Sequence, residues 1–458
     1  MFDGKTVVGT TLRVEGTVDS LQEPARTSAR AEARGSPQPR LPETIVSEVA
    51  PFPAIRYDTQ RFGGDLSSVL APPYDVLDEA DKKALLARSD RNITAIDLPH
   101  LPPKSAGPAE VYDRAAAALQ DWLRDGTLTR DPVPALYLYH QRFEHDGRPF
   151  TRRMFIARLR LQPFSEGSIL PHERTFGGPK EDRLALMKAT QCQLSPIFGL
   201  YSDPTNKVAA LLAATASRPV DAVGTVDDVE SKLWVVSDPN VIQSVVAAMA
   251  DRKVYIADGH HRYGTALMYR DRLREQHGGA LPDGHPANYV MFVLAGMDDP
   301  GCLILPYYRV LEHIDADALA AAWSAGTDKA SAGGADVVLW DGRSGKETPL
   351  KFIARAKLAT LEPGESPAWR QLDYAYLHRY LIDELLPRKL GTAPVIHYVK
   401  SLDEAKQAAR ESAGVALLVN ATPMVHLRAV AESGGLMPQK STYFFPKLAT
   451  GLTIHSLT

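Results

Sequence analysis

The sequence predicts a mixed α/β protein. Three observations lead to this prediction: a globular composition, an alternation of short β-rich runs with amphipathic segments, and two Asp-Gly turns that are each flanked by strand-like runs. The chain has 458 residues, of which 44% are apolar and 23% are charged, and this balance is typical of soluble globular domains. At roughly 150 residues per domain, two or three structural units are expected.

Residues 1–48 differ from the rest of the chain. They mix Arg, Ala, Ser and Pro without hydrophobic periodicity, most clearly from Glu23 to Arg40. Such a segment buries too little apolar surface to offset the entropy that it would lose on ordering. We therefore expect a disordered tail over 1–48, and a basic interaction arm is the alternative.

The elements that follow are predicted from hydrophobic period and turn residues. Two β-rich runs around the Asp-Gly turn at 145–148 predict a hairpin. The first expected elements are a strand over 51–57, a rigid turn over 71–76, a helix over 108–124 and the hairpin strands 136–143 and 151–161.

The middle and last thirds of the chain alternate strands with helices. In the middle we expect helix 183–189, strand 196–201, helix 240–252, strand 253–257, helix 261–276 and strands 289–294 and 303–310. After these we expect a hairpin of 337–340 with 350–356, helix 374–386, strand 395–399, a helix opened by the capping box at 401–404, strand 416–419 and helix 425–432.

Composition argues against several classes of protein. Fifty-two Lys and Arg against 55 Asp and Glu leave a net charge of −3, without the basic excess of nucleic-acid-binding proteins. No run approaches the eighteen or so apolar residues of a membrane span, and the N-terminus lacks the apolar core of a signal peptide. Cys192 and Cys302 are too few for a disulfide framework. We expect a cytoplasmic protein without nucleic-acid or membrane partners, and the oligomeric state stays open.

The run Asp258-Gly259-His260-His261-Arg262 is the strongest indication of a site. A hydrophobic strand ends at Asp258, Gly259 permits a sharp turn, and polar residues fill the first turn of a helix. A helix N-terminus binds anions through its free N–H groups and the positive end of its dipole. Arg262 adds a planar fork suited to phosphate, and His260 or His261 adds a donor or a base. A capped helix with exposed polar side chains is the alternative.

The run His172-Glu173-Arg174 is the second indication, because it combines a base, an acid and a cation shortly before a helix. A loop glutamate paired with Arg174 or Arg183 is the alternative. Tyr74 and Asp75 are weaker candidates for substrate binding, since the Pro-Pro-Tyr-Asp run is also typical of a structural turn.

Lys440-Ser441-Thr442 is similar to the end of a phosphate-binding P-loop, but Gln439 stands where that motif needs its second Gly, so we reject the motif. Lys440 or Lys447 can still serve as a point charge for phosphate. The alternative is a C-terminal strand with solvated lysines.

A zinc site made by His172, His260 and His261 is not expected, because adjacent histidines rarely bind one metal and no Cys or His-x-x-x-His spacing supports them. Mg²⁺ held between Asp258 and nucleotide phosphates is the more natural metal, since Mg²⁺ usually needs only one or two carboxylates.

The Asp258 run resembles the signature of the ParB/sulfiredoxin superfamily, whose members bind nucleotide phosphates with a Gly-x-x-Arg turn between a strand and a helix. Among its branches, Asp-Gly-His-His-Arg is most similar to the free serine kinases. Where sulfiredoxin has its catalytic Cys, this chain has His260, which excludes that chemistry. The resemblance implies a phosphate-binding core over 166–311, an N-terminal α/β region over 49–165 and a C-terminal α/β region over 312–458.

The resemblance to free serine kinases also implies a function. ATP or ADP with Mg²⁺ would be the donor, and the hydroxyl of a small molecule, in that branch free L-serine, would be phosphorylated. Glu173 would be the general base. The remaining candidates are Asp258, His260 and His261 for catalysis, Gly259, His260, Arg262 and Lys440 for the nucleotide, and His172, Arg174, Tyr74 and Asp75 for the substrate. A nucleotide-binding regulator without turnover and a phosphate-ester hydrolase are the alternative functions.

From about Val49 onward the chain also resembles the family called domain of unknown function 1015, whose name implies no activity. The matching runs are 52–56, 72–76, 170–175, 195–198, 258–262 and 437–444.

Overall fold

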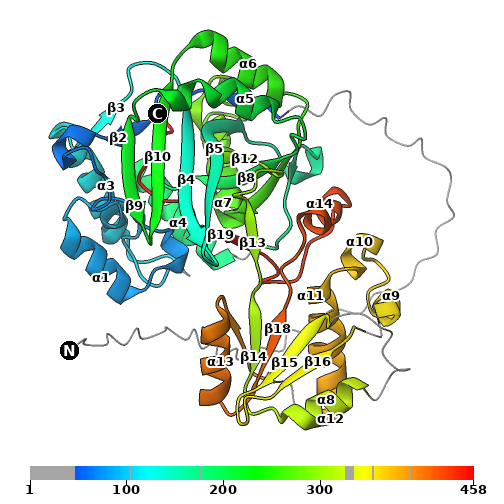
Figure 1. Cartoon of the computed structure of the whole chain (residues 1–458). Coiled ribbons are helices and arrows are strands. Elements are labelled where there is room, and N and C mark those ends of the chain that lie inside the picture. Colours follow the sequence, from blue (N-terminus) through cyan, green and yellow to red (C-terminus); the bar gives the residue numbers. More distant parts are fainter. Residues whose placement is uncertain (1–46, 104, 176, 325–334, 353–354, 392–393) are drawn as a thin grey trace, which may run out of the picture. The chain divides into compact units, whose positions relative to one another are not determined.

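The computed structural model describes residues 47–103, 105–175, 177–324, 335–352, 355–391 and 394–458 (Figure 1). The chain forms two compact units. The larger unit contains Ile45–Pro306, Ala354–Tyr380 and Asn420–Thr458, and the smaller one contains Tyr307–Ile353 and Leu381–Val419. Within the described parts of the chain, no helix is both long and apolar enough to cross a membrane.

A mixed sheet forms the centre of the larger unit (Figure 1). Its strand order is β6-β11-β8-β12-β5-β4-β10-β9, with β1 paired to β5. The strands are β1 Val49–Ala50, β4 Leu136–His145, β5 Arg148–Arg160, β6 Ile169–Leu170, β8 Ile197–Tyr201, β9 Ala222–Val226, β10 Val229–Val236, β11 Val254–Asp258 and β12 Tyr289–Gly296.

Helices and small two-stranded sheets complete the larger unit. Its helices are α1 Glu79–Arg88, α2 Thr94–Asp97, α3 Ala109–Arg124, α4 Gly177–Thr190, α5 Lys207–Ala213, α6 Pro239–Met249, α7 His260–Gln276, α9 Leu358–Leu361, α10 Pro367–Arg370, α11 Asp373–Ala375 and α14 Met424–Glu432. The small sheets pair β2 Ile55–Tyr57 with β3 Leu128–Arg130, β7 Cys192–Gln193 with β20 His455–Ser456, and β13 Leu303–Leu305 with β19 Tyr443–Phe445.

The core of the larger unit lies between the sheet and its helices. Buried side chains of β5, β8, β11 and β12 contact apolar residues of α6 and α7, among them Val245 and Tyr263. Every residue of β8 is buried, and β8 has strands on both sides. The sheet therefore gives a rigid base for the loops that follow β6 and β11.

The smaller unit is an antiparallel sheet with helices. Its strand order is β16-β15-β18-β14-β17. The elements are β14 Tyr308–Leu311, α8 Ala316–Ser324, β15 Val337–Asp341, β16 Glu347–Leu350, α12 Leu386–Leu390, β17 Ile396–Val399, α13 Leu402–Glu411 and β18 Val415–Val419. Ala405 and Ala409 of α13 pack in a cluster with Val310, Trp340 and Ala416 of the sheet.

The predicted mixed α/β class is confirmed, and so are most of the elements. The helix expected over 108–124 is α3, and the hairpin at 145–148 joins β4 to β5. At its turn Asp146 and Gly147 both have positive φ, at 50° and 68°, as a two-residue hairpin turn with the twist of its strands requires.

Three expectations were wrong or differ from the structure. The strand expected over 303–310 is two strands, β13 and β14, which lie in different sheets; Pro306 stands between them, and it cannot donate a ladder hydrogen bond. The second strand of the later hairpin is Glu347–Leu350 rather than 350–356. The helix expected over 374–386 is built from α11, a π-helical stretch at Tyr376–Leu385, and α12.

The compact units do not follow the expected ranges 49–165, 166–311 and 312–458. Strands from 49–165 and 166–311 share one sheet, since β12 pairs with β5, and 420–458 returns to the larger unit. The tail expected over 1–48 lies outside the described residues except for Ser47 and Glu48.

Candidate functional site

The site is built around the start of α7. Strand β11 ends at Asp258, and Gly259 turns the chain into the helix with φ of 94°. A Cβ at Gly259 would lie 3.0 Å from Nε of Arg262. Glycine is therefore required here twice, for its positive φ and for the close approach of the guanidinium.

Arg262 is buried and holds this turn together. Its Nη2 donates to Oδ2 of Asp258 at 2.7 Å, and its Nη1 donates to the backbone oxygen of Pro196, just before β8. The guanidinium group of Arg262, which was expected to bind phosphate, thus forms its hydrogen bonds within the protein. It fixes the start of α7 against the start of β8.

Asp258 is held between two cations. Its second oxygen, Oδ1, accepts a hydrogen bond from Nζ of Lys447 at 3.1 Å. Burial alone would raise the pKa of Asp258, but Lys447 and Arg262 outweigh burial and hold that pKa well below its usual range. Asp258 is therefore an anion that ties the C-terminal segment to the start of α7.

A buried pair on the central hairpin clamps the backbone next to Lys447. Gln141 and Arg152 face each other on β4 and β5. Arg152 donates to the backbone oxygen of Pro446 at 2.6 Å, and Gln141 donates to the backbone oxygen of Lys447 at 2.9 Å. Arg152 also donates to Oε1 of Gln141. Neither residue was singled out from the sequence, where nothing distinguishes Arg152 from the other arginines of its strand.

Two buried histidines connect β6, β11 and α7. Nδ1 of His172 lies 2.8 Å from the backbone oxygen of Ile256, which can only accept, so this nitrogen carries the proton. Nε2 of His172 then accepts from the hydroxyl of Thr442 at 3.0 Å. Burial lowers the pKa of His172 to about 4. His172, a predicted substrate ligand, is thus a neutral part of the packing.

His260 is oriented by its neighbour. The backbone N–H of His172 donates to Nε2 of His260 at 3.2 Å, so the proton of a neutral His260 is on Nδ1. That nitrogen faces Oε2 of Glu173 at 3.8 Å. Burial lowers the pKa of His260 well below its usual value. Because its lone pair is already engaged, His260 is not suited to act as a base, and its Nδ1 lies near Glu173 without a hydrogen bond to it.

The carboxyl group of Glu173 is influenced by charged side chains of α7 and of the C-terminal segment. Burial raises the pKa of its carboxyl group, while Lys440, Lys447 and His261 act against the rise. About a third of its side chain, 34%, remains exposed. Glu173 is thus a carboxyl group with increased basicity that solvent can still reach.

The other predicted residues lie at different places. His261 is half-buried, and its pKa is lowered first by burial, with Glu173 and Asp75 acting in the opposite direction. Arg174 is exposed and acts on the pKa of Glu365. The structure therefore groups His261 and Asp75 with Glu173, and it gives Arg174 no contact with the Asp258 run.

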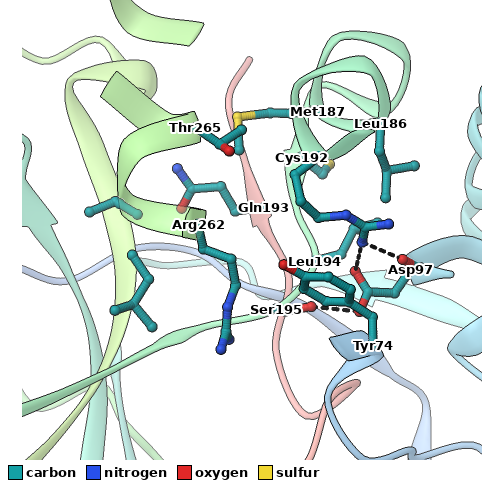
Figure 2. A pocket seen from close by; sticks show the side chains of 13 residues that line it. Tyr74, Asp97, Leu186, Met187, Cys192, Gln193, Leu194, Ser195, Arg262 and Thr265 are labelled. Carbon is teal, nitrogen blue, oxygen red and sulfur yellow. Dashed lines mark hydrogen bonds and ion pairs between the residues drawn. The ribbon is translucent and has the colours of Figure 1, made fainter. Parts of the chain in front are cut away.

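A pocket lies on the other side of Arg262 (Figure 2). It is enclosed by α4, α7 and the segment from Cys192 to Ile197, and Tyr74 forms part of its wall. The ring of Tyr74 stacks on Arg183, whose Cζ is 4.0 Å from the ring centre. Arg183 in turn binds Asp182 and Asp97. Tyr74 was a candidate from the sequence, whereas Asp97 and Arg183 were not.

A metal at Asp258 would need a rearrangement. Both carboxylate oxygens already accept from cationic side chains, so Mg²⁺ would have to displace Lys447. In the described parts of the chain no three His, Cys, Asp or Glu side chains are grouped to hold a metal ion. We therefore derive no step through a metal bound to Asp258.

Comparison with known proteins gives structural likenesses and one family. No curated protein matches the sequence. A mutant free serine kinase in complex with ADP superposes with a TM-score of 0.32 at 10% identity, covering 65% of this chain and 92% of that chain. SbnI with a C-terminal truncation, from Staphylococcus aureus, gives 0.33 at 9%, with 66% and 87% covered. A conserved hypothetical protein from Pyrococcus furiosus gives 0.30 at 13%, with 65% and 95% covered.

Superpositions this weak do not define a function. The family result is clear, because a model described as "Protein of unknown function (DUF1015)" matches residues 49–375. This chain belongs to that family.

Proposed function

We propose that this protein is a nucleotide-dependent phosphotransferase that acts on the hydroxyl group of a small molecule. The observation that supports the proposal most is the position of Glu173. Its carboxyl group, with a raised pKa, lies beside His260 in the first turn of α7 and under the charges of Lys440 and Lys447. The proposed general base and the proposed phosphate site therefore lie next to each other.

The start of α7 is suited to bind phosphate. The first N–H groups of a helix have no acceptor within the helix, and the dipole adds positive potential. Lys447 and Lys440 add positive charge to the same region, since both act on the pKa of Glu173. Arg262 and Asp258 position this turn and do not themselves contact the phosphates.

Glu173 is suited to be the general base. In the proposed step the acceptor hydroxyl gives its proton to Glu173, its oxygen forms a bond to the terminal phosphorus, and the bond from that phosphorus to the bridging oxygen breaks. A raised pKa makes a carboxylate a better base at neutral pH. The remaining catalysis is positioning and neutralisation of charge.

Free L-serine is the first acceptor to test. The reason is the resemblance of the run from Asp258 to Arg262 to the free serine kinases, which implies O-phosphoserine as the product.

The test is detection of O-phosphoserine by mass spectrometry after incubation with L-serine, Mg²⁺ and either ATP or ADP. Glu173→Gln should lower turnover at least about a hundredfold, the usual contribution of a general base, and should still bind nucleotide. Glu166→Gln is the matched control, since Glu166 is an exposed glutamate of the preceding loop. Unchanged turnover in Glu173→Gln would contradict the role of Glu173. Nucleotide binding without any product would favour a regulator without turnover.

A further inference from the structure

The pocket beside Arg262 contains a polar group without a partner. Tyr74 is only 5% exposed. Among the described residues its hydroxyl has no hydrogen-bond partner, although its ring is fixed against Arg183 at 4.0 Å. Figure 2 shows this hydroxyl pointing away from Asp97, into the pocket. This oxygen is not among the fully buried polar atoms without a partner in the described residues, so it is accessible from the pocket and can form a hydrogen bond to a ligand atom.

The charged groups of the pocket are already paired within the protein. Asp97 accepts from the hydroxyl of Ser195 at 2.6 Å and from Arg183. Arg183 also donates to Asp182 at 2.7 Å. Arg262 is engaged by Asp258 and Pro196. A zwitterion such as a free amino acid would find no unpaired charge here, so the pocket fits an uncharged group.

The rest of the lining is mostly apolar, and its polar members Gln193 and Thr265 form hydrogen bonds within the protein. Leu186 and Met187 of α4 face Ile197 of β8 and Val290 of β12. Such walls favour a flat or apolar group, with the phenol of Tyr74 as the group that fixes its orientation. Arg262 lines the pocket and is also in the first turn of α7, so the pocket adjoins the proposed phosphate site.

We infer that this pocket binds the base of the nucleotide, with the hydroxyl of Tyr74 hydrogen-bonded to a ring nitrogen or exocyclic group of that base. This inference rests on the proposed function and extends it. The phosphates bind at the start of α7, and the base binds in the pocket between α4 and β8.

The experiment compares three probes by calorimetry on the full chain: ATP, adenosine and inorganic tripolyphosphate. Tyr74→Phe removes only the hydroxyl. It should weaken ATP and adenosine binding by about three- to tenfold, the value of one neutral hydrogen bond, and leave tripolyphosphate binding unchanged. Its melting temperature without ligand should not fall, because no internal hydrogen bond is lost. Tyr57→Phe is the matched control: its hydroxyl donates to the backbone oxygen of Arg91 at 2.7 Å, so stability should fall while all three affinities stay the same.

The outcomes separate this inference from the proposed function. Equal ATP affinity in Tyr74→Phe and the unmodified protein, or ATP binding no tighter than tripolyphosphate, would overturn the base pocket while the phosphate site stands. Adenosine binding that Tyr74→Phe weakens, without tripolyphosphate binding, would support the pocket and contradict the phosphate site. No binding of any probe would contradict both.

Discussion

At the scale of single residues, the site contains histidines that are neutral and an aspartate that is charged. Burial keeps His172 and His260 neutral, and their hydrogen bonds fix which ring nitrogen carries the proton. Asp258 stays ionised because two cations contact it. Among the carboxyl groups of the site, Glu173 has its pKa raised, first by burial, which makes it the better base.

This difference leads to a prediction for Lys440, whose charge lowers the pKa of Glu173. Removing that charge raises the pKa further, and the base is then ionised only at higher pH. In Lys440→Asn the acidic limb of the pH profile of kcat/KM should therefore move to higher pH. Asparagine suits the position because Lys440 has φ of 55°, which Asn tolerates.

Lys188→Asn is the control for that measurement, because Lys188 is an exposed lysine of α4. Its profile should overlay that of the unmodified protein. An acidic limb that does not move in Lys440→Asn, or moves to lower pH, would show that Glu173 is not the group that titrates.

At the scale of elements, the sequence predicted the junction of β11 and α7 but not what packs against it. A buried strand, a glycine and a polar helix start are local features, so the run from Asp258 to Arg262 could be recognised. The docking of the C-terminal segment depends on contacts between residues far apart in sequence, such as Met437 donating to the backbone oxygen of His172 at 2.7 Å. No local pattern encodes such a contact. The pairing of Lys447 with Asp258 was missed for this reason.

The hydrogen bonds from Gln141 and Arg152 to the backbone of Lys447 and Pro446 lead to the second prediction. Arg152→Met keeps an unbranched side chain but removes the donors to the backbone oxygens of Phe445 and Pro446. Lys447 should then lose its position beside Asp258. We expect phosphotransfer to fall about as far as in Lys447→Met, and the double variant to be no worse than Lys447→Met alone, because coupled residues are not additive.

The matched control for Arg152 is Arg270→Met. Arg270 is also buried and donates to the backbone oxygen of Leu161 at 2.7 Å, but it lies outside the site. Its replacement should lower the melting temperature and leave kcat/KM per folded molecule unchanged. Full additivity of Arg152→Met with Lys447→Met would contradict the positioning role of Arg152.

At the scale of the whole molecule, the larger unit collects segments from the entire chain. Its central sheet orders strands from 49–50 to 289–296, and 420–458 adds β19 and β20. The resemblance suggested consecutive ranges, and periodicity could not correct them, since it reports which residues face a core but not which core they share. The mixed α/β class could be predicted, because it depends only on the local alternation of strand and helix patterns.

Histidines of the larger unit, three of them buried and His140 partly buried, should control its stability in acid. Burial lowers the pKa of His140 and His172 to about 4 and that of His455 to about 3, and it lowers the pKa of His260 as well. Below pH 6.5 each of these groups binds a proton when unfolded but not when folded. Their contribution to stability is thus complete above pH 6.5 and is lost as pH falls toward 4. Each proton is worth about 1.4 kcal/mol per pH unit.

The raised pKa values of Asp97 and Glu173 act against this loss, because protonated carboxyl groups favour the folded state during acidification. Asp227, Asp299 and Glu365 act in the same way, while the lowered pKa values of His261 and His285 add to the loss. Unfolded histidines bind protons near pH 6.5, well above the pH at which unfolded carboxyl groups do, so the free energy of unfolding, measured with urea at pH 7, 6 and 5, should fall. His140→Phe should make that slope smaller by about one proton, near 1.4 kcal/mol per pH unit, since a phenyl ring can replace imidazole beside Trp234, 5.0 Å away. His277→Phe, at an exposed histidine, should leave the slope unchanged. An unfolding free energy that stays constant from pH 7 to pH 5 would show that these histidines do not remain neutral in the folded protein, and with them the neutral state assigned to His260 beside Glu173 would fail.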